Sequence, residues 1–241
     1  MEPVKANEQG LALHRKLETI DKGFKEFVYA VSHDLQAPVR HMGSYANWLA
    51  EDEMKNLSVE GQNHLNRIIQ TSKRLQSMID ELVVYSRNYH LTPQKSLIDL
   101  NILVESIYTS IGINTNVKWE IATLPTVYAD KAMIHMVFKN LLSNSLKFTT
   151  YTENPSISIQ VQEQEEEYIF SIADNGIGFD MAYSEKLFVV FQRLHRRTEF
   201  EGNGMGLAQV RQVIDIHGGQ VWAEGVVNAG ATFYFTLPKD M

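Results

Sequence analysis

Hydrophobic residues in the first third of the chain recur in alternating steps of four and three. One such run consists of Leu13, Leu17, Ile20, Phe24, Phe27 and Val31. A second run keeps the same spacing with serine at two of its positions and consists of Leu65, Ile68, Ser72, Leu75, Ile79, Leu82 and Ser86. This spacing is typical of the seam of a coiled coil. The pattern therefore predicts a hairpin of two long helices, joined by a polar loop from Glu51 to Leu57, with Ser58 as the N-cap of the second helix.

A hairpin of only two such helices leaves much of its apolar surface uncovered. Two copies of the hairpin can bury that surface in a four-helix bundle. We therefore expect this part of the chain to form a homodimer.

One histidine of the first predicted helix stands next to a carboxylate. His33 follows the seam residue Val31 by two positions, about 200° around the helix, and should project outward. Asp34 could accept a proton from one ring nitrogen and leave the other as a nucleophile. Pro38 should kink the helix just beyond this pair. A solvent-exposed or cap-bonding imidazole is the commoner role for a histidine, so this segment alone favours that interpretation over a reactive one.

The pattern changes after a segment, Asn88 to Ser96, that contains Thr92-Pro93 and has no apolar periodicity. We expect a helical hairpin with an N-terminal coiled coil in residues 1–90, a linker in 91–96 and a second domain in 97–241. In the second domain the pattern predicts helices and strands in mixed order. The predicted helices are Leu100–Gly112, Asp130–Phe148 and Gly204–His217, and the predicted strands are Val117–Ile121, Thr126–Ala129, Ser156–Gln162, Tyr168–Ala173, Gln220–Glu224 and Ala231–Leu237. This order favours an α/β sandwich with one mixed sheet covered by helices on one face.

Composition narrows the partners and the location. The chain has 241 residues and a formal net charge of −7, without a Lys/Arg cluster, so nucleic acid and direct membrane contact are not expected. There is no cysteine, which fits a reducing compartment. The sequence lacks an apolar run of about 18 residues, and its start is not that of a signal peptide. We therefore expect a cytoplasmic location.

Polar residues gather on one arc of the predicted helix Asp130–Phe148. Asn140, Asn144 and Lys147 lie at the edge of its buried face. An amide oxygen can ligate Mg²⁺ and an ammonium group can contact phosphate oxygens. An exposed polar stripe would give the same pattern, so both interpretations remain open at this point.

Two glycine-rich loops flank a long irregular segment. Asp174-Asn175-Gly176-Ile177-Gly178 ends a predicted strand, and Gly202-Asn203-Gly204-Met205-Gly206-Leu207 begins a predicted helix. Glycines at such junctions let backbone amides approach an anion, and a buried Asp174 could accept a hydrogen bond from an exocyclic amine. The segment between them, Phe179 to Glu201, is long and poorly patterned, which suggests a mobile lid.

Taken together, these motifs resemble those of the sensor histidine kinases of two-component signalling, from about Gly10 to Pro238. The segment from Ser32 to Pro38 looks like the phospho-acceptor box, and Asn140 to Thr149 like the asparagine box. Asp174 to Gly178, Phe188 to Arg193 and Gly202 to Leu207 look like the first glycine, phenylalanine and second glycine boxes. The residues of the acceptor box, of Phe191 to His195 and of the ending Gly230 to Phe233 are most similar to those of the phytochrome-like branch. The resemblance implies a dimerisation and phosphotransfer hairpin followed by a Bergerat-type ATP-binding domain.

The resemblance also implies a role for each matching residue. His33 would accept the γ-phosphoryl group of ATP with Asp34 as its general base, and Asn144 would hold Mg²⁺, with Asn140 near the metal. Asp174 would bind the adenine amine, with Thr232 beside it through a water, and Lys147 and Arg193 would meet phosphate. Phe191 would pack the lid. The remaining nucleotide-binding positions are Gly176, Gly178, Gly202, Gly204, Gly206 and Leu207.

The implied function is an ATP-dependent protein-histidine kinase that passes its phosphoryl group to an aspartate of a response regulator receiver domain. Its signal would come from an upstream sensor domain or protein outside this chain. The alternatives are a dimeric pseudokinase scaffold and an ATPase of the same nucleotide-binding fold, which would have no use for the acceptor box. Ala37 stands where many relatives carry a threonine or asparagine that orients water, so the resemblance does not extend to a phosphatase role.

Overall fold

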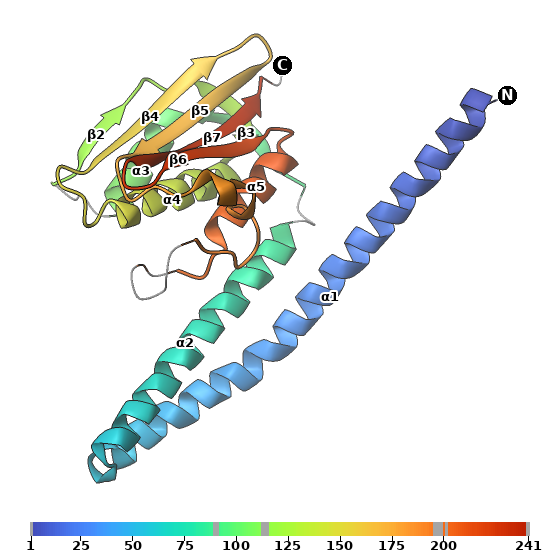
Figure 1. The fold of residues 1–241 in the computed structure, drawn as a ribbon. Helices are drawn as coiled ribbons and strands as arrows, with labels where there is room; N and C mark the ends of the chain where they lie inside the picture. Colours follow the sequence, from blue (N-terminus) through green and yellow to red (C-terminus); the bar gives the residue numbers. More distant parts are fainter. Residues whose placement is uncertain (1, 89–91, 112–115, 195–199, 201, 240–241) are drawn as a thin grey trace. The chain divides into compact units, whose positions relative to one another are not determined.

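The fold is that of a computed structural model, which describes residues 2–88, 92–111, 116–194, 200 and 202–239. The side chains of residues 2–22, 24 and 25 lie outside the described part. The chain divides into two compact units, Met1–His90 and Leu91–Met241, and each is considered by itself (Figure 1).

The first unit is the predicted hairpin of two long helices. Helix α1 spans Glu2–Glu53, a short 3₁₀ helix η1 spans Met54–Asn56, and α2 spans Val59–Asn88. Ser58 caps α2, because its Oγ accepts a hydrogen bond from the backbone N–H of Gly61 at 3.1 Å. The loop between the two helices is shorter than the predicted Glu51 to Leu57, since α1 continues to Glu53 before the turn.

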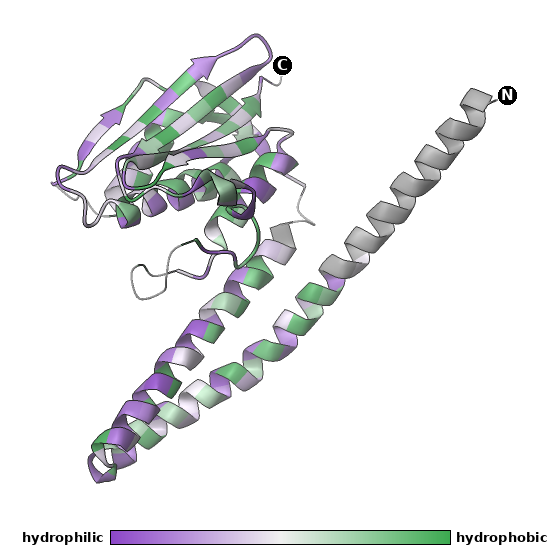
Figure 2. Cartoon of the chain, viewed as in Figure 1, coloured by the Kyte–Doolittle hydropathy of each residue, from purple (hydrophilic) through white to green (hydrophobic). Residues whose placement is uncertain are grey.

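The seam of α2 separates into two sets of residues. Leu65, Ser72, Ile79 and Ser86 are buried in the hairpin, and the Ser72 hydroxyl donates to the backbone oxygen of Val39 on α1 at 3.1 Å. Ile68 and Leu75, on the alternate seam positions, remain 50% and 40% exposed. Figure 2 shows apolar and polar residues interleaved along the described part of both helices. A single hairpin therefore leaves part of the α2 seam exposed.

The first helix keeps an apolar surface of its own. Val31, Leu35, Met42 and Leu49 are all exposed on α1. The side chains of the earlier seam residues Leu13, Leu17, Ile20 and Phe24 fall outside the described part. The helix also continues through Pro38 without a break, and its axis bends along its length in Figure 1. Because proline removes one backbone donor, a bend without termination is the expected response.

The second unit is the predicted sandwich of helices on a mixed sheet. Its helices are α3 (Leu100–Ser110), α4 (Lys131–Phe148) and α5 (Gly206–Ile216), and its strands are β1 (Lys95–Asp99), β2 (Lys118–Ile121), β3 (Thr126–Asp130), β4 (Ser156–Glu163), β5 (Glu167–Asp174), β6 (Val221–Val226) and β7 (Gly230–Pro238). Five strands form a sheet in the order β2-β4-β5-β7-β6, in which only β2 and β4 are parallel. The helices lie on one face of it (Figure 1).

The core lies between this sheet and the helices. Phe138 of α4 packs edge-to-face on Phe170 of β5 and Phe235 of β7, and all three are fully buried. Asp130 starts α4, because its carboxylate accepts from the backbone N–H groups of Ala132 and Met133. These contacts fix the helix that carries Asn140, Asn144 and Lys147.

Two elements differ from the sequence-based expectation. β1 begins at Lys95, inside the predicted linker 91–96, and pairs with β3 in a separate two-stranded sheet. Ile98 is the only fully buried residue of β1, so its alternation is too short to be recognised as a strand. A 3₁₀ helix, η2 (Met181–Lys186), lies inside the predicted lid. Within the described ranges, no helix has the length and apolar character needed to cross a membrane.

Candidate active site

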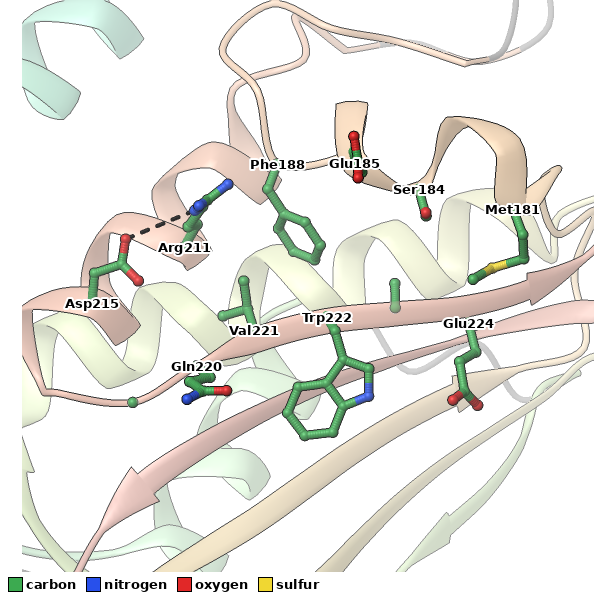
Figure 3. A pocket seen from close by; sticks show the side chains of 12 residues that line it. Met181, Ser184, Glu185, Phe188, Arg211, Asp215, Gln220, Val221, Trp222 and Glu224 are labelled. Atoms are coloured by element: carbon green, nitrogen blue, oxygen red, sulfur yellow. Dashed lines mark ion pairs between the residues drawn. The ribbon is translucent and has the colours of Figure 1, made fainter.

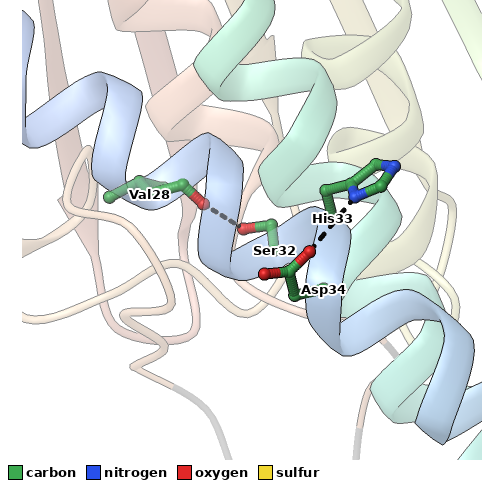
Figure 4. Close-up of polar contacts among 4 residues, drawn as sticks. All are labelled: Val28, Ser32, His33 and Asp34. Atoms are coloured by element: carbon green, nitrogen blue, oxygen red, sulfur yellow. Dashed lines mark hydrogen bonds and ion pairs between the residues drawn. The ribbon is translucent and has the colours of Figure 1, made fainter.

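His33 projects from α1 into solvent, as the heptad pattern predicts. Its side chain is 68% exposed, and its Nδ1 lies 3.4 Å from Oδ1 of Asp34 (Figure 4). The preceding Ser32 is buried, and its hydroxyl donates to the backbone oxygen of Val28 at 2.6 Å. The Tyr29 ring lies 6.5 Å from the imidazole, centroid to centroid. The helix therefore buries Ser32 and turns the His33–Asp34 pair outward.

The second unit brings together the three polar residues predicted on α4. Asn140, Asn144 and Lys147 are all half-buried, and Lys147 Nζ donates to Asn144 Oδ1 at 3.1 Å. Burial lowers the pKa of the Lys147 ammonium, and the nearby positive charge of Arg193 lowers it further. The exposed-stripe interpretation is therefore wrong for this face of α4.

Asp174, at the end of β5, is a buried carboxylate with one free oxygen. It is 8% exposed, and its Oδ1 accepts from the backbone N–H of Gly176 at 3.0 Å. Its Oδ2 is buried and has no hydrogen-bond partner in the described part of the chain. Burial raises the pKa of Asp174 to about 6, and the hydrogen bond from Gly176, with the nearby Ser145 hydroxyl and Ala231 N–H, opposes this. A buried acceptor without a partner is costly unless a ligand supplies the donor.

The two glycine loops approach neighbouring backbone closely. Gly178 has φ +57°, and a Cβ there would lie 2.0 Å from the Val226 carbonyl oxygen. Gly204 has φ +77°, and its carbonyl accepts from the Phe191 N–H at 3.0 Å. A side chain at either position would collide with backbone, so these turns require glycine.

The second glycine loop also reaches the polar face of α4. A Cβ on Gly206 would lie 3.2 Å from Asn140 Oδ1, and one on Gly202 would lie 3.5 Å from Lys147 Nζ. Leu207 is half-buried against the hydrophobic core and anchors the start of α5. The two loops, α4 and Asp174 thus belong to one contiguous region of the second unit.

The lid is held by contacts that differ from those expected. Arg193 donates to the carbonyl oxygens of Phe200 and Gly202, so its guanidinium connects the lid to the second glycine loop. Phe191 is 38% exposed and has φ +62°, whereas Phe200 is buried against Phe148 with ring centroids 5.1 Å apart. Phe200 therefore packs the lid where Phe191 was predicted to do so. Lid residues 195–199 and 201 lie outside the described part.

The structure does not bring Thr232 together with Asp174. In the β5–β7 pairing, Asp174 is opposite Ala231 and Thr232 is opposite Ala173. Because side chains alternate between the faces of a sheet, Thr232 shares the face of Tyr234, away from the Asp174 carboxylate. Burial raises the pKa of Tyr234, and a hydrogen bond with the Thr232 hydroxyl opposes this rise.

A separate groove lies outside this region. It has a volume of about 830 Å³ and is formed by η2, α5 and β6, with Phe188, Trp222 and Arg211 among its lining residues (Figure 3). Arg211 Nε lies 3.8 Å from Asp215 Oδ2 in the same groove. It contains none of the residues predicted to bind nucleotide.

The donor set of the α4 region fits Mg²⁺ bound together with phosphates. Asn144 Oδ1 and Asn140 Oδ1 are amide oxygens, which suit a hard cation. No group of three or more His, Cys, Asp or Glu side chains within the described ranges is arranged to hold a metal ion. Mg²⁺ does not require such a group, because it usually keeps waters and phosphate oxygens as ligands.

Two contact residues were missed by the sequence analysis. Gln209 of α5 accepts a hydrogen bond from Asn140 Nδ2 at 3.1 Å, and Phe200 packs the lid. Gln209 is a polar residue at a buried position of a helix that the sequence already predicted. A polar residue on the apolar face of that helix could have marked it as a contact residue. Phe200 is one of the few apolar residues in a polar segment.

Comparison with known proteins gives two family matches. Residues 25–89 match the His Kinase A (phospho-acceptor) domain, and residues 129–241 match the Histidine kinase-, DNA gyrase B-, and HSP90-like ATPase domain. Cyanobacterial phytochrome A of Nostoc sp. is 34% identical over 235 residues, covering 94% of this chain and 30% of the phytochrome. The sensor histidine kinase WalK of Bacillus subtilis is 32% identical over 235 residues, covering 92% and 38%. The chain thus spans well under half the length of these relatives.

Solved structures share the fold. Full-length ShkA in complex with AMPPNP has a TM-score of 0.64 at 21% identity, covering 88% of this chain and 45% of that one. ThkA in complex with the response regulator protein TrrA has a TM-score of 0.57 at 22% identity, covering 88% and 61%. The arrangement of two long helices followed by an α/β sandwich is therefore found in solved histidine kinases.

Proposed function

The chain belongs to the sensor histidine kinases of two-component signalling, and we propose that it transfers the γ-phosphoryl group of ATP to its own His33. The observation that carries this proposal is the pairing, in one chain, of an exposed histidine beside a carboxylate with a buried, unsatisfied Asp174 in the second unit. The pseudokinase alternative would leave both features without a use.

The first unit supplies the nucleophile. Because Nδ1 of His33 faces Asp34, Nε2 is the nitrogen that attacks the γ-phosphorus. A bond forms between Nε2 and phosphorus, the bond to the bridging oxygen breaks, and ADP leaves. Asp34 accepts the Nδ1 proton as the ring becomes positively charged.

The second unit supplies the nucleotide site. Asp174 Oδ2 would accept a hydrogen bond from the adenine amine, and the glycine loops would enclose the phosphates. Lys147 would contact phosphate oxygens, and Asn144 Oδ1, with Asn140 nearby, would hold Mg²⁺. The bound ion would neutralise negative charge on the phosphates during transfer.

The proposal is tested by incubating the protein with γ-labelled ATP and Mg²⁺. Label that is stable to alkali and lost in acid is expected on the protein, because a phosphoramidate has this stability. Steady ATP hydrolysis without labelled protein would contradict the proposal and favour an ATPase of the same fold.

We further propose that the phosphoryl group passes to an aspartate of a response regulator receiver domain. ThkA, which shares the fold, has been solved in complex with the response regulator protein TrrA. The exposed position of His33 is consistent with access by such a partner. Loss of label from the kinase and its appearance on a receiver domain would support the transfer.

We also propose a homodimer formed through the exposed seam residues of α1 and α2. Replacing Ile68 and Leu75 together by glutamate should yield a monomer in light scattering, because four charges would have to be buried in the bundle. Val59→Glu is the control, since Val59 is exposed on the opposite side of α2. A double variant that remains dimeric would place the interface elsewhere.

A further inference from the structure

Asn140 of α4 is held in place by a side chain of the neighbouring helix. Its Nδ2 donates to Gln209 Oε1 on α5 at 3.1 Å. Gln209 is only 9% exposed, so water competes little for this hydrogen bond. The contact joins residues 69 positions apart in the sequence, across two packed helices.

This hydrogen bond is made in one orientation of the Asn140 carboxamide. The oxygen and nitrogen of an amide have nearly the same shape, and only their partners distinguish the two orientations. In the structure Gln209 turns its Oε1 toward Asn140, and Asn140 directs its NH₂ group there. Asn140 Oδ1 then faces the second glycine loop, where a Cβ on Gly206 would be 3.2 Å away.

The orientation decides whether Asn140 can contact a cation. In the observed orientation, an oxygen points toward the start of α5 from the same face of α4 that carries Asn144 and Lys147. The opposite orientation would present an NH₂ group, which cannot ligate a metal ion or accept a hydrogen bond from its waters.

Gln209 is itself fixed relative to the glycine loop. It lies in the first turn of α5, and its backbone N–H donates to the Met205 carbonyl at 2.9 Å. A movement of the loop that begins α5 therefore changes the position of the acceptor for Asn140.

We propose that Gln209 is a positioning residue for the Mg²⁺–nucleotide complex, which it serves by holding the Asn140 carboxamide with its oxygen toward the phosphates. The inference rests on the proposed function of the second unit. It adds a residue that does not touch the nucleotide and acts only through Asn140.

The test compares Gln209→Leu with Gln212→Leu, a control at a second buried glutamine of α5. The measurement is calorimetric binding of a non-hydrolysable ATP analogue with and without Mg²⁺. Gln209→Leu should reduce the tightening of binding by Mg²⁺ by about tenfold, because loss of a residue that orients a metal ligand typically costs this much. Metal-free binding should be nearly unchanged. Gln209→Glu keeps the acceptor and should retain the wild-type response.

Two outcomes would overturn the inference. One is full tightening by Mg²⁺ in Gln209→Leu, and the other is an equal loss in Gln212→Leu. If Gln209→Leu fails to fold in thermal unfolding, the near-isosteric Gln209→Met decides between these outcomes. The readout requires no phosphoryl transfer, so an absence of labelled protein would reject the proposed function without deciding this inference.

Discussion

Replacing Asp174 by asparagine is expected to abolish ATP binding and, at the same time, to stabilise the second unit at neutral pH. The buried Oδ2 is the acceptor available for the adenine amine. An asparagine can place an NH₂ group there, and two donors cannot form a hydrogen bond. Titration with a fluorescent ATP analogue should show no saturable binding.

The gain in stability follows from the raised pKa of Asp174. The folded chain holds this proton up to about pH 6, whereas the pKa of an ordinary, solvated aspartate is 3.8. The carboxyl group therefore favours folding fully below pH 3.8, and this contribution is lost as the pH rises to about 6. Above that range the buried charge opposes folding. Asp174→Asn should therefore raise the free energy of unfolding at pH 7.5 by at most about 3 kcal/mol, less the cost of burying its own unpaired NH₂ group.

The same titration predicts a pH dependence of binding. ATP affinity of the wild type should fall below about pH 6, because the protonated carboxyl loses part of its capacity to accept from the adenine amine. Asp215→Asn is the control. Partial desolvation also raises the pKa of Asp215, opposed by Arg211, but this largely exposed residue lies in the separate groove. Saturable binding by Asp174→Asn with unchanged affinity would show that adenine is bound elsewhere.

Replacing Asp34 by asparagine should lower the rate of autophosphorylation by about a hundredfold, the usual contribution of a general base. Asparagine keeps the shape of aspartate but cannot accept the Nδ1 proton of His33. Affinity for the ATP analogue should not change, because Asp34 belongs to the helical unit and is exposed. The measurement is the initial rate of labelling at saturating ATP.

A matched control for this variant is Asp80→Asn. Asp80 is a carboxylate of α2 whose Oδ1 accepts from the side chains of Gln36 and Gln76. Asp80→Asn changes the charge of the hairpin by the same amount and should label at close to the wild-type rate. Equal losses in both variants would indicate that the overall charge matters, and that Asp34 is not the base.

Periodicity alone was sufficient for the long elements. Helices α2, α4 and α5 bury apolar residues at helical spacing, and α1 repeats an apolar face that stays exposed in a single chain. Strand β1 was missed because Ile98 alone is buried in it. Its place is determined by pairing with β3, which local sequence does not encode.

Local features of the candidate site could be predicted from residue type. Features that depend on strand register or on contacts between distant elements could not. A glycine at positive φ or a carboxylate at a strand end is visible as a motif, as at Gly204 and Asp174. The face of Thr232 depends on its register with β5, and the partner of Asn140 lies on another helix. Such contacts are set by packing between elements distant in sequence.

Phosphorylation of His33 is tested by mapping the phosphorylated residue by mass spectrometry under non-acidic conditions after incubation with Mg²⁺ and ATP. We expect one phosphoryl group on the His33 imidazole and none in His33→Ala, with ATP binding intact in that variant. Phosphate on the neighbouring Ser32, or undiminished phosphorylation of His33→Ala, would contradict this expectation.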